Sequence, residues 1–314
     1  MGGPEALIQL VSGLPCDLNA AVFIVLHVAA QGPSYLAERL NSAGALPAAP
    51  AKDGEPIQPG RIYVAVPDRH LMLEGGCVRL SRGPRESHAR PSIDVLFRSA
   101  AYFGGPRVIG IVLTGMLDDG AAGLWAIKDR GGIAVVQSPA EAAYPSMPLS
   151  ALKNVKVDYT LKLVEMPPVL RTLTTKHMEG TAVTTPNQKL EIENRIALED
   201  NALEIGVRAL GSPSFFTCPE CHGSLVAIEE GSIRRFKCHT GHGFTEASLS
   251  QRAMPRVEDS LWGALAQLEE RAVLLEELKA RNPTDARLAD EARDTRQLAG
   301  RLRDLLADPT FRRV

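Results

Sequence analysis

The 314-residue sequence has no apolar run close to the roughly 18–20 residues that span a bilayer, so we expect no membrane insertion. It also has neither a basic region nor a long apolar segment near Met1, which predicts a cytoplasmic protein without a signal peptide. A net charge of −2 gives no general attraction to polyanions, and we expect no nucleic-acid partner. Cysteine is scarce and odd in number, with three of the five residues between 218 and 238, which does not fit a disulfide framework.

The composition is that of a globular protein with room for two domains, 45% hydrophobic and 23% charged. Four β-branched runs predict strands that are buried on both faces: 21–28, 61–66, 108–113 and 133–136. The stretches between them have apolar residues three and four apart and predict covering helices: 4–11, 34–41, 92–103 and 120–130. This alternation predicts an α/β fold with a doubly wound, mostly parallel sheet.

The rest of the chain shows other sequence patterns. A hairpin is expected at 71–80, the polar stretch 174–187 predicts a linker, and 189–210 fits strand, helix or both. Two apolar stripes separated at Asn282-Pro283 predict an α-helical hairpin; they comprise Leu261, Leu265, Leu268, Ala272, Leu275 and Leu278, then Leu288, Ala292, Leu298, Leu302 and Leu305. We therefore expect an α/β domain over 1–173, a partly structured linker over 174–213, a small module over 214–245 and the hairpin over 246–314.

That small module is defined by Cys and His spacing. Cys218 and Cys221 form a C-x2-C knuckle, and Cys238 and His242 form a C-x3-H knuckle. Three thiolates and an imidazole are a ligand set for tetrahedral structural zinc, so the sequence predicts a zinc-ribbon-like module. His222 and His239 are alternative ligands, less favoured because each is adjacent to a Cys. Four protein ligands leave no open position, so we expect the ion to support folding and expect no catalytic cofactor.

Two residues lie where α/β sheets usually hold their chemistry, just beyond the carboxyl ends of strands. His27 closes the first predicted strand, and Asp119 lies in the loop after the strand at 108–113. An imidazole and a carboxylate placed together can serve as the base and the orienting acid of a hydrolase. The simpler interpretations are a structural histidine and an aspartate that caps the following helix.

Many segments in the first half resemble, in order, the catalytic domain of bacterial chemotaxis protein-glutamate methylesterases (CheB-type). They are GGPEAL, IVLHV, LAERL, PIQPGRIYVAVPDRHL, RPSIDVLFRSAA, LTGMLDDGAAGL, GGIAVVQSP and SMPLSAL. The Cys/His module resembles an extension of some stand-alone relatives without a receiver domain, in which CP-x-C and C-x-x-GH motifs precede a helical tail.

The resemblance implies hydrolysis of methylated glutamates on a methyl-accepting chemoreceptor or similar signalling protein, and possible glutamine deamidation. It gives His27 the role of general base and Asp119 that of orienting acid. It places the backbone of Met116 at the substrate and oxyanion site, and Arg90 near its mouth. The alternative is a non-catalytic scaffold protein that binds a partner through the zinc module and the helices.

The serine of that family lies in a G-A-S-x-G-G turn after the first strand. Met1-Gly2-Gly3 corresponds to x-G-G, so the serine and its strand are expected ahead of Met1. Ser12 and Ser34 do not lie on such a turn. The favoured explanation is a start site assigned too far downstream, the other a catalytically inactive domain. Without its first strand the sheet should have an unpaired edge, and the chain as written should be inactive.

Overall fold

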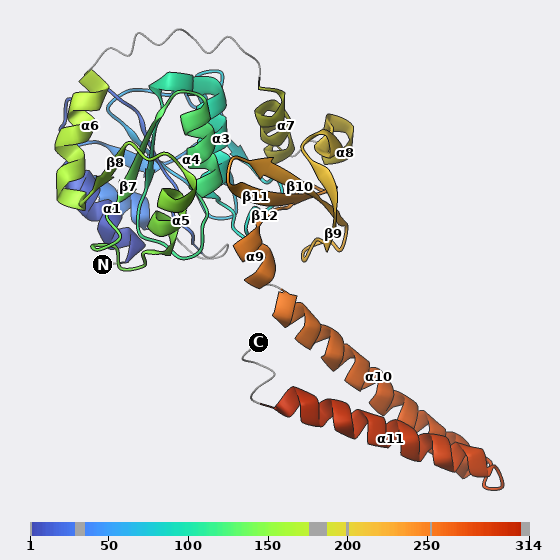
Figure 1. Ribbon diagram of the computed structural model, residues 1–314. Helices are drawn as coiled ribbons and strands as arrows, with labels where there is room; N and C mark the ends of the chain where they lie inside the picture. The colour runs from blue at the N-terminus through green and yellow to red at the C-terminus, as the bar shows by residue number, and fades with distance from the viewer. Residues whose placement is uncertain (1, 29–34, 176–186, 199–200, 252, 309–314) are drawn as a thin grey trace. The chain divides into compact units, whose positions relative to one another are not determined.

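The computed structural model describes residues 2–28, 35–175, 187–198, 201–251 and 253–308. They form two compact units, 1–248 and 249–314 (Figure 1). The first unit holds the α/β layers and the Cys/His module, and the second holds the helical hairpin. The domain limits drawn from the sequence stay predictions, and residues 176–186 of the polar stretch 174–187 lie outside the described residues.

The α/β part confirms the predicted fold class. One set of parallel strands has the order β1-β3-β2, comprising Val22–Ile24, Ile62–Val64 and Ala48–Pro50. The other has the order β6-β7-β8, comprising Ile109–Val112, Ile133–Gln137 and Tyr159–Leu161. The helices are α1 Gly3–Ser12, α2 Leu36–Ala43, α3 Ile93–Gly104, α4 Ala121–Asp129, α5 Ser146–Asn154 and α6 Met166–Thr175.

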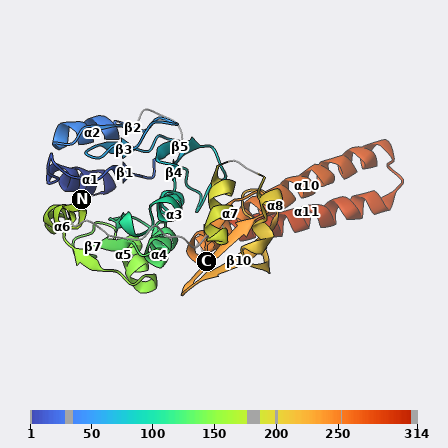
Figure 2. The same cartoon turned by 90° about the horizontal axis from the view of Figure 1, so that it is seen from above.

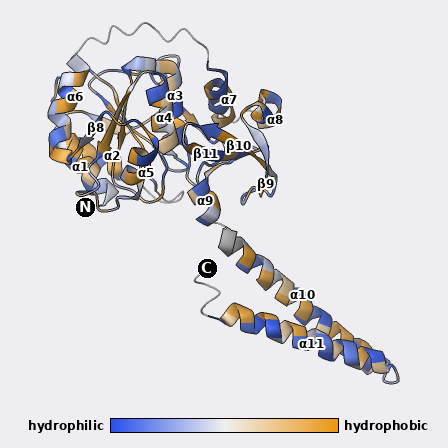
Figure 3. Ribbon diagram, in the orientation of Figure 1, coloured by the Kyte–Doolittle hydropathy of each residue, from blue (hydrophilic) through white to orange (hydrophobic). Residues whose placement is uncertain are grey.

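Alternate side chains of the strands enter two different apolar cores. Tyr63 and Val136 pack with α3 and α4, whereas Ile62, Val64 and Val135 pack with α1, α2 and α6. The strands are accordingly among the most apolar segments of this unit (Figure 3). Burial on both faces is the reason why their sequences read as continuous apolar runs.

The sheet is divided at its centre. Among the described residues, β1 pairs only with β3 and β6 only with β7, so each of these two strands has an open edge (Figure 2). A cavity of about 680 Å³ is lined by residues of both strands, by Gly3 and Pro4 of α1, and by residues of α3. Its lining is mainly aliphatic, the environment in which a strand buried on both faces would pack. The unpaired edge predicted from the sequence is therefore present twice.

The second half of the first unit is an antiparallel sheet with two helices. Its strand order is β12-β11-β10-β9, comprising Gly243–Thr245, Ile233–Cys238, Ser224–Glu230 and Ser212–Thr217. Helices α7 Gln188–Ala197 and α8 Ala202–Ile205 precede it, so the described parts of the ambiguous stretch 189–210 are mainly helical, and α9 Glu246–Gln251 follows. The predicted hairpin at 71–80 is β4 His70–Glu74 paired with β5 Cys77–Ser81.

The second unit consists of α10 Ala253–Arg281 and α11 Ala286–Ala307, which pack along their length. The seam on α10 follows the predicted stripe, but the expectation for α11 was wrong in part. Leu298 and Leu305 are about half exposed, and Ala299 and Leu306 are buried in their place. Steps of three and four residues in alternation lead from Ala292 to these positions. Heptad spacing, and not the size of the side chains, therefore determines which residues of α11 face α10. No described helix is long and apolar enough to cross a membrane.

Candidate functional site

His27 and Asp119 meet at the carboxyl edge of the divided sheet. His27 follows β1 by three residues, and Asp119 lies in the loop between β6 and α4. The imidazole Nε2 is 2.6 Å from Asp119 Oδ2, although the two residues are 92 positions apart in sequence. The side chain of His27 is 39% exposed and that of Asp119 only 3%, so the ring is accessible while the carboxylate behind it is buried.

The structure does not support Asp119 as the cap of its own helix. The N-cap of α4 is Gly120, in a left-handed conformation, with no side-chain capping bond. Asp119 instead accepts hydrogen bonds at the start of a different helix, α3: from Ile93 N at 2.7 Å and Asp94 N at 3.1 Å. Ser92 Oγ donates a further bond at 2.9 Å. The first amides of a helix carry partial positive charge, so they hold this carboxylate ionised and oriented.

Asp94 makes the corresponding contact in the other direction, from α3 to the start of α4. Its carboxylate accepts hydrogen bonds from Gly120 N at 2.9 Å and Gly123 N at 2.7 Å, in the first turn of α4. Each of the two helices thus receives an aspartate from the other, which fixes the loop that holds Asp119. Sequence reasoning did not identify Asp94, because its partners come from another helix that only tertiary packing brings near.

The electrostatics of the pair follow from this geometry. Burial disfavours the charged ring of His27, but the hydrogen bond and negative charge of Asp119 prevail and raise the pKa of His27 above 6.5. Burial likewise opposes ionisation of Asp119, but His27 and the two backbone amides prevail and lower the pKa of Asp119. Burial and the charge of Asp119 raise the pKa of Asp94. An accessible base backed by an ionised acid can abstract and return a proton.

The other residues singled out near this site have different surroundings. Met116 is 66% exposed and lines the cavity together with His27 and Asp119. Arg90 donates to Asp68 Oδ1 at 2.7 Å and to the carbonyl oxygen of Arg82 at 2.7 Å, so its guanidinium braces the loop before α3. The substrate-binding roles of Met116 and Arg90 stay predictions.

His70 lies nearby but has a structural environment. It is buried, its Nε2 bonds the carbonyl oxygen of Pro84, and burial lowers its pKa to about 4, as suits a structural residue.

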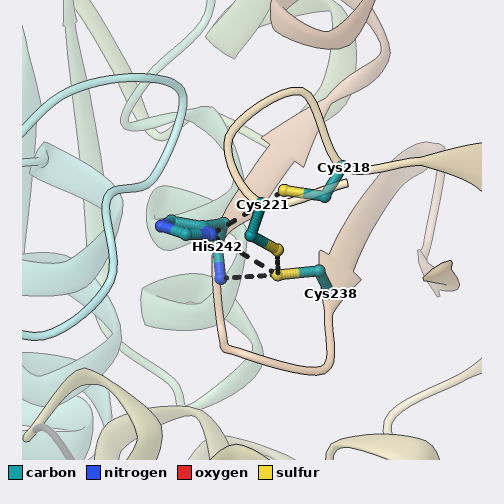
Figure 4. A group of neighbouring side chains, drawn as sticks. All are labelled: Cys218, Cys221, Cys238 and His242. Carbon is teal, nitrogen blue, oxygen red and sulfur yellow. Dashed lines mark hydrogen bonds between the residues drawn. The ribbon is translucent and has the colours of Figure 1, made fainter. Parts of the chain in front are cut away.

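The four predicted metal ligands converge in the small module (Figure 4). Cys218 and Cys221 come from the loop between β9 and β10, Cys238 ends β11, and His242 precedes β12. Their donor atoms all lie within 4.8 Å of one another, so this Cys3His cluster could hold a metal ion. Neither alternative ligand, His222 or His239, belongs to the group brought together among the described residues.

The donor separations can be compared with those of a tetrahedral ion. The Sγ atoms of Cys221 and Cys238 are 3.6 Å apart, and Nδ1 of His242 is 3.7 Å from Cys218 Sγ and 3.6 Å from Cys238 Sγ. Tetrahedral zinc, with bonds of about 2.3 Å to sulfur and 2.0 Å to nitrogen, separates its ligands by roughly 3.5–3.8 Å. The donor set and its spacing fit a zinc-sized ion.

His88 has two partners that are distant in sequence. His88 Nδ1 is 2.8 Å from Glu220 Oε1, inside the first Cys knuckle, and its Nε2 is 3.1 Å from the carbonyl oxygen of Ser248. These partners are 132 and 160 residues away, so no local pattern could have indicated them. His88 therefore belongs to the contact between the Cys/His module and the α/β part.

Comparisons with known proteins agree with this geometry. The family model for CheB methylesterase matches residues 1–170. A protein-glutamate methylesterase/protein-glutamine glutaminase of Anaeromyxobacter dehalogenans is 41% identical over 174 residues, 55% of this chain and 51% of that protein. One of Myxococcus xanthus is 42% identical over 151 residues, 47% of this chain and 43% of that protein. This chain thus spans about half the length of these relatives.

The structural comparison covers the same part of the chain. The crystal structure of the Thermotoga maritima CheB methylesterase catalytic domain matches with a TM-score of 0.52 and 31% sequence identity, over 55% of this chain and 93% of that domain. The fold, the order of its segments and a family match over more than half of the sequence agree. The protein belongs to the CheB methylesterase family.

Proposed function

We propose that the chain carries the hydrolase site of a protein-glutamate methylesterase, which cleaves glutamate methyl esters on a chemoreceptor or similar signalling protein and could deamidate glutamine. The 2.6 Å contact between His27 and Asp119 at the mouth of the cavity supports this function most directly. The relatives' names and the shared fold support the same reaction class. A cytoplasmic location belongs to this proposal.

In the proposed reaction a serine hydroxyl attacks the ester carbonyl, and His27 takes its proton. Because Nε2 contacts Asp119, we propose that Nδ1 takes the proton. In this proposal the backbone N–H of Met116 stabilises the oxyanion, and Arg90 has a substrate-binding role near the mouth of the site. The C–O bond to the methoxy group breaks, methanol leaves with the proton from His27, and water then hydrolyses the acyl-enzyme by the same route.

The test adds the serine turn that the resemblance implies. A chain extended by about ten residues, a strand and a turn reading Gly-Ala-Ser before Met1, should release methanol from methylated receptor, while the 314-residue chain should not. We expect the added strand to fill the cavity lined by β1 and β6, and the turn to bring the serine beside His27. The matched control is the same extension with alanine in place of that serine. Equal methanol release by the extended chain and this control would refute the proposal.

We further propose that the Cys3His cluster binds structural zinc. The purified chain should hold about one zinc per molecule, and Cys238→Ser should reduce this to near zero, because it removes one of four ligands. Cys16→Ser is the matched control, since Cys16 is exposed and lies outside the cluster. Metal analysis after gel filtration measures the content, and zinc retained by Cys238→Ser would contradict this ligand assignment.

A further inference from the structure

The Cys/His module touches the rim of the hydrolase cavity at three places, and the first is a backbone contact. Ser87 N donates to the carbonyl oxygen of Gly243 at 2.8 Å, and Gly243 N donates to that of Arg85 at 3.1 Å. Gly243 directly follows the ligand His242, and Ser87 lines the same cavity as His27. A β-carbon at Gly243 would lie 3.0 Å from the side chain of Glu86, so glycine permits this close approach.

The second contact starts inside the first Cys knuckle. Glu220 lies between Cys218 and Cys221 and bonds His88 Nδ1 at 2.8 Å through its carboxylate. The imidazole of His88 also packs on the ring of Phe244 in β12, with centroids 5.2 Å apart. The short rim segment 85–88 is therefore held at two places. Its backbone bonds Gly243, directly after the second knuckle, and its His88 side chain bonds Glu220 inside the first knuckle.

The third contact reaches the loop that bears the catalytic acid. Thr245 Oγ1 donates to Asp118 Oδ1 at 2.9 Å and accepts from Ser248 N at 3.1 Å. Thr245 is three residues from the ligand His242, and Asp118 directly precedes Asp119. A short, partly buried connection therefore links the metal cluster to the turn that holds the partner of His27.

A separate attachment holds the module's sheet against the α/β part. Lys237 Nζ donates to Glu86 Oε1 at 2.6 Å. Arg235 forms two bonds to Glu193 of α7, at 2.8 and 3.0 Å, and Glu193 in turn lies 3.7 Å from Arg98 of α3. Lys237 and Arg235 lie on the paired part of β11, outside the knuckle loops. Loss of the ion should loosen the knuckle loops and their contacts while the sheet stays docked.

We propose that Glu220 and Thr245 are positioning residues for the hydrolase site. A metal ion bound in the Cys3His cluster holds them where this role requires them. The ion ties the loops at 218–221 and 238–242 together, and these hold the rim segment 85–88 and the Asp118–Asp119 turn in place. The binding free energy of a structural metal ion stabilises the ordered form of the segments that carry its ligands, and through their contacts also the neighbouring segments. The inference rests on the proposed hydrolase function.

The first test is hydrogen exchange of the full 314-residue chain, with zinc bound and after chelation. Zinc should slow exchange about tenfold in peptides that cover 85–88 and 117–120, and leave β7 and α1 unchanged. The one-dimensional proton spectrum should show the His27–Asp119 hydrogen-bond proton more sharply with zinc. Protection confined to residues 214–245, or a chain that binds no zinc, would overturn the proposal.

Substitutions then separate positioning from general folding. Thr245→Val removes the hydroxyl at equal size; it should keep zinc but lose the zinc-dependent protection at 117–120, while Thr245→Ser restores it. Glu220→Gln should lose the protection at 85–88 alone. If Thr245→Val behaves as the unsubstituted chain, Thr245 is not a positioning residue.

Activity gives an independent measurement in the serine-bearing extended chain. Thr245→Val should lower kcat about tenfold with KM unchanged, because it displaces the acid without touching substrate. An unchanged kcat would overturn the positioning role while leaving the hydrolase function standing. Absence of esterase activity together with zinc-dependent protection of the rim would instead refute the hydrolase function and keep the metal-dependent contact.

Discussion

Replacing Asp119 with asparagine in the serine-bearing extended chain should lower methyl-ester hydrolysis about ten-thousand-fold, the scale seen when a serine hydrolase loses its orienting acid. The amide cannot stabilise the imidazolium that forms in turnover, and its NH2 group favours the wrong tautomer of His27. His27→Ala should cost about a million-fold, because it removes the base itself. Methanol release at saturating and limiting receptor concentrations measures both effects.

The same substitution has a second readout that needs no nucleophile. In the 314-residue chain, the pKa of His27 should lie above 6.5, because Asp119 outweighs the effect of burial. In Asp119→Asn only burial and the more distant Asp94 act, so the pKa should fall below 6.5. Titration of the His27 ring signals by NMR measures both values.

The sign of the pH dependence follows from this shift. A raised pKa in the folded state means that the pair stabilises the fold at low pH and loses that contribution as pH rises through the pKa of His27. Catalysis behaves oppositely, since a general base must be neutral, so the rate should rise with pH across the same pKa. Asp129→Asn, at the exposed end of α4, makes the same chemical change away from the site and should alter neither quantity. A His27 pKa equal in the two variants would show that Asp119 does not act on the ring.

The contact between His27 and Asp119 was predictable because it needs only one topological rule. The carboxyl ends of parallel strands gather at one edge of a sheet, and both residues follow strands with clear apolar patterns. The anchoring of Asp119 by Ser92, Ile93 and Asp94 was not predictable. It depends on α3 and α4 packing with their first turns together, which no local pattern encodes.

The Cys3His cluster and its docking show the same division. The Cys and His spacing is local, so the sequence alone favours Cys218, Cys221, Cys238 and His242 over the alternatives His222 and His239. The docking of the module rests on side chains separated by up to 151 positions, such as Lys237 and Glu86. Charged residues in a sequence are usually solvated, and nothing in their spacing distinguishes these buried ones.

Glu193→Gln should destabilise the first unit by about 3–5 kcal/mol, the scale of breaking a buried ion pair. Glu193 is 1% exposed, bonds Arg235 twice and lies 3.7 Å from both Arg98 and Lys237. Burial opposes its ionisation, but these three cations prevail and lower its pKa to about 2. The contribution is therefore present at neutral pH and is lost as pH falls through that value. Thermal unfolding should shift downward by on the order of 10 °C.

An exposed pair of similar geometry provides the control. Arg171 Nη2 is 3.0 Å from Asp17 Oδ2, but both side chains are more than half exposed. Solvent screens this pair, so Asp17→Asn should change the free energy of unfolding by less than about 1 kcal/mol. A loss in Glu193→Gln no larger than this would show that the buried charges do not hold the module in place.

A double substitution tests whether the stability of the first unit depends on the balance of buried charge or on Glu193 itself. Removing Glu193 alone leaves three cations, Arg98, Arg235 and Lys237, facing two carboxylates. Removing Lys237 as well, in Glu193→Gln with Lys237→Met, leaves two complete pairs, Arg98 with Glu86 and Arg235 with Glu230. The cost of an uncompensated buried charge then disappears, so the double variant should be more stable than Glu193→Gln alone. If it is less stable, the bonds made by Lys237 matter more than the balance of charge, and the module is held by specific contacts.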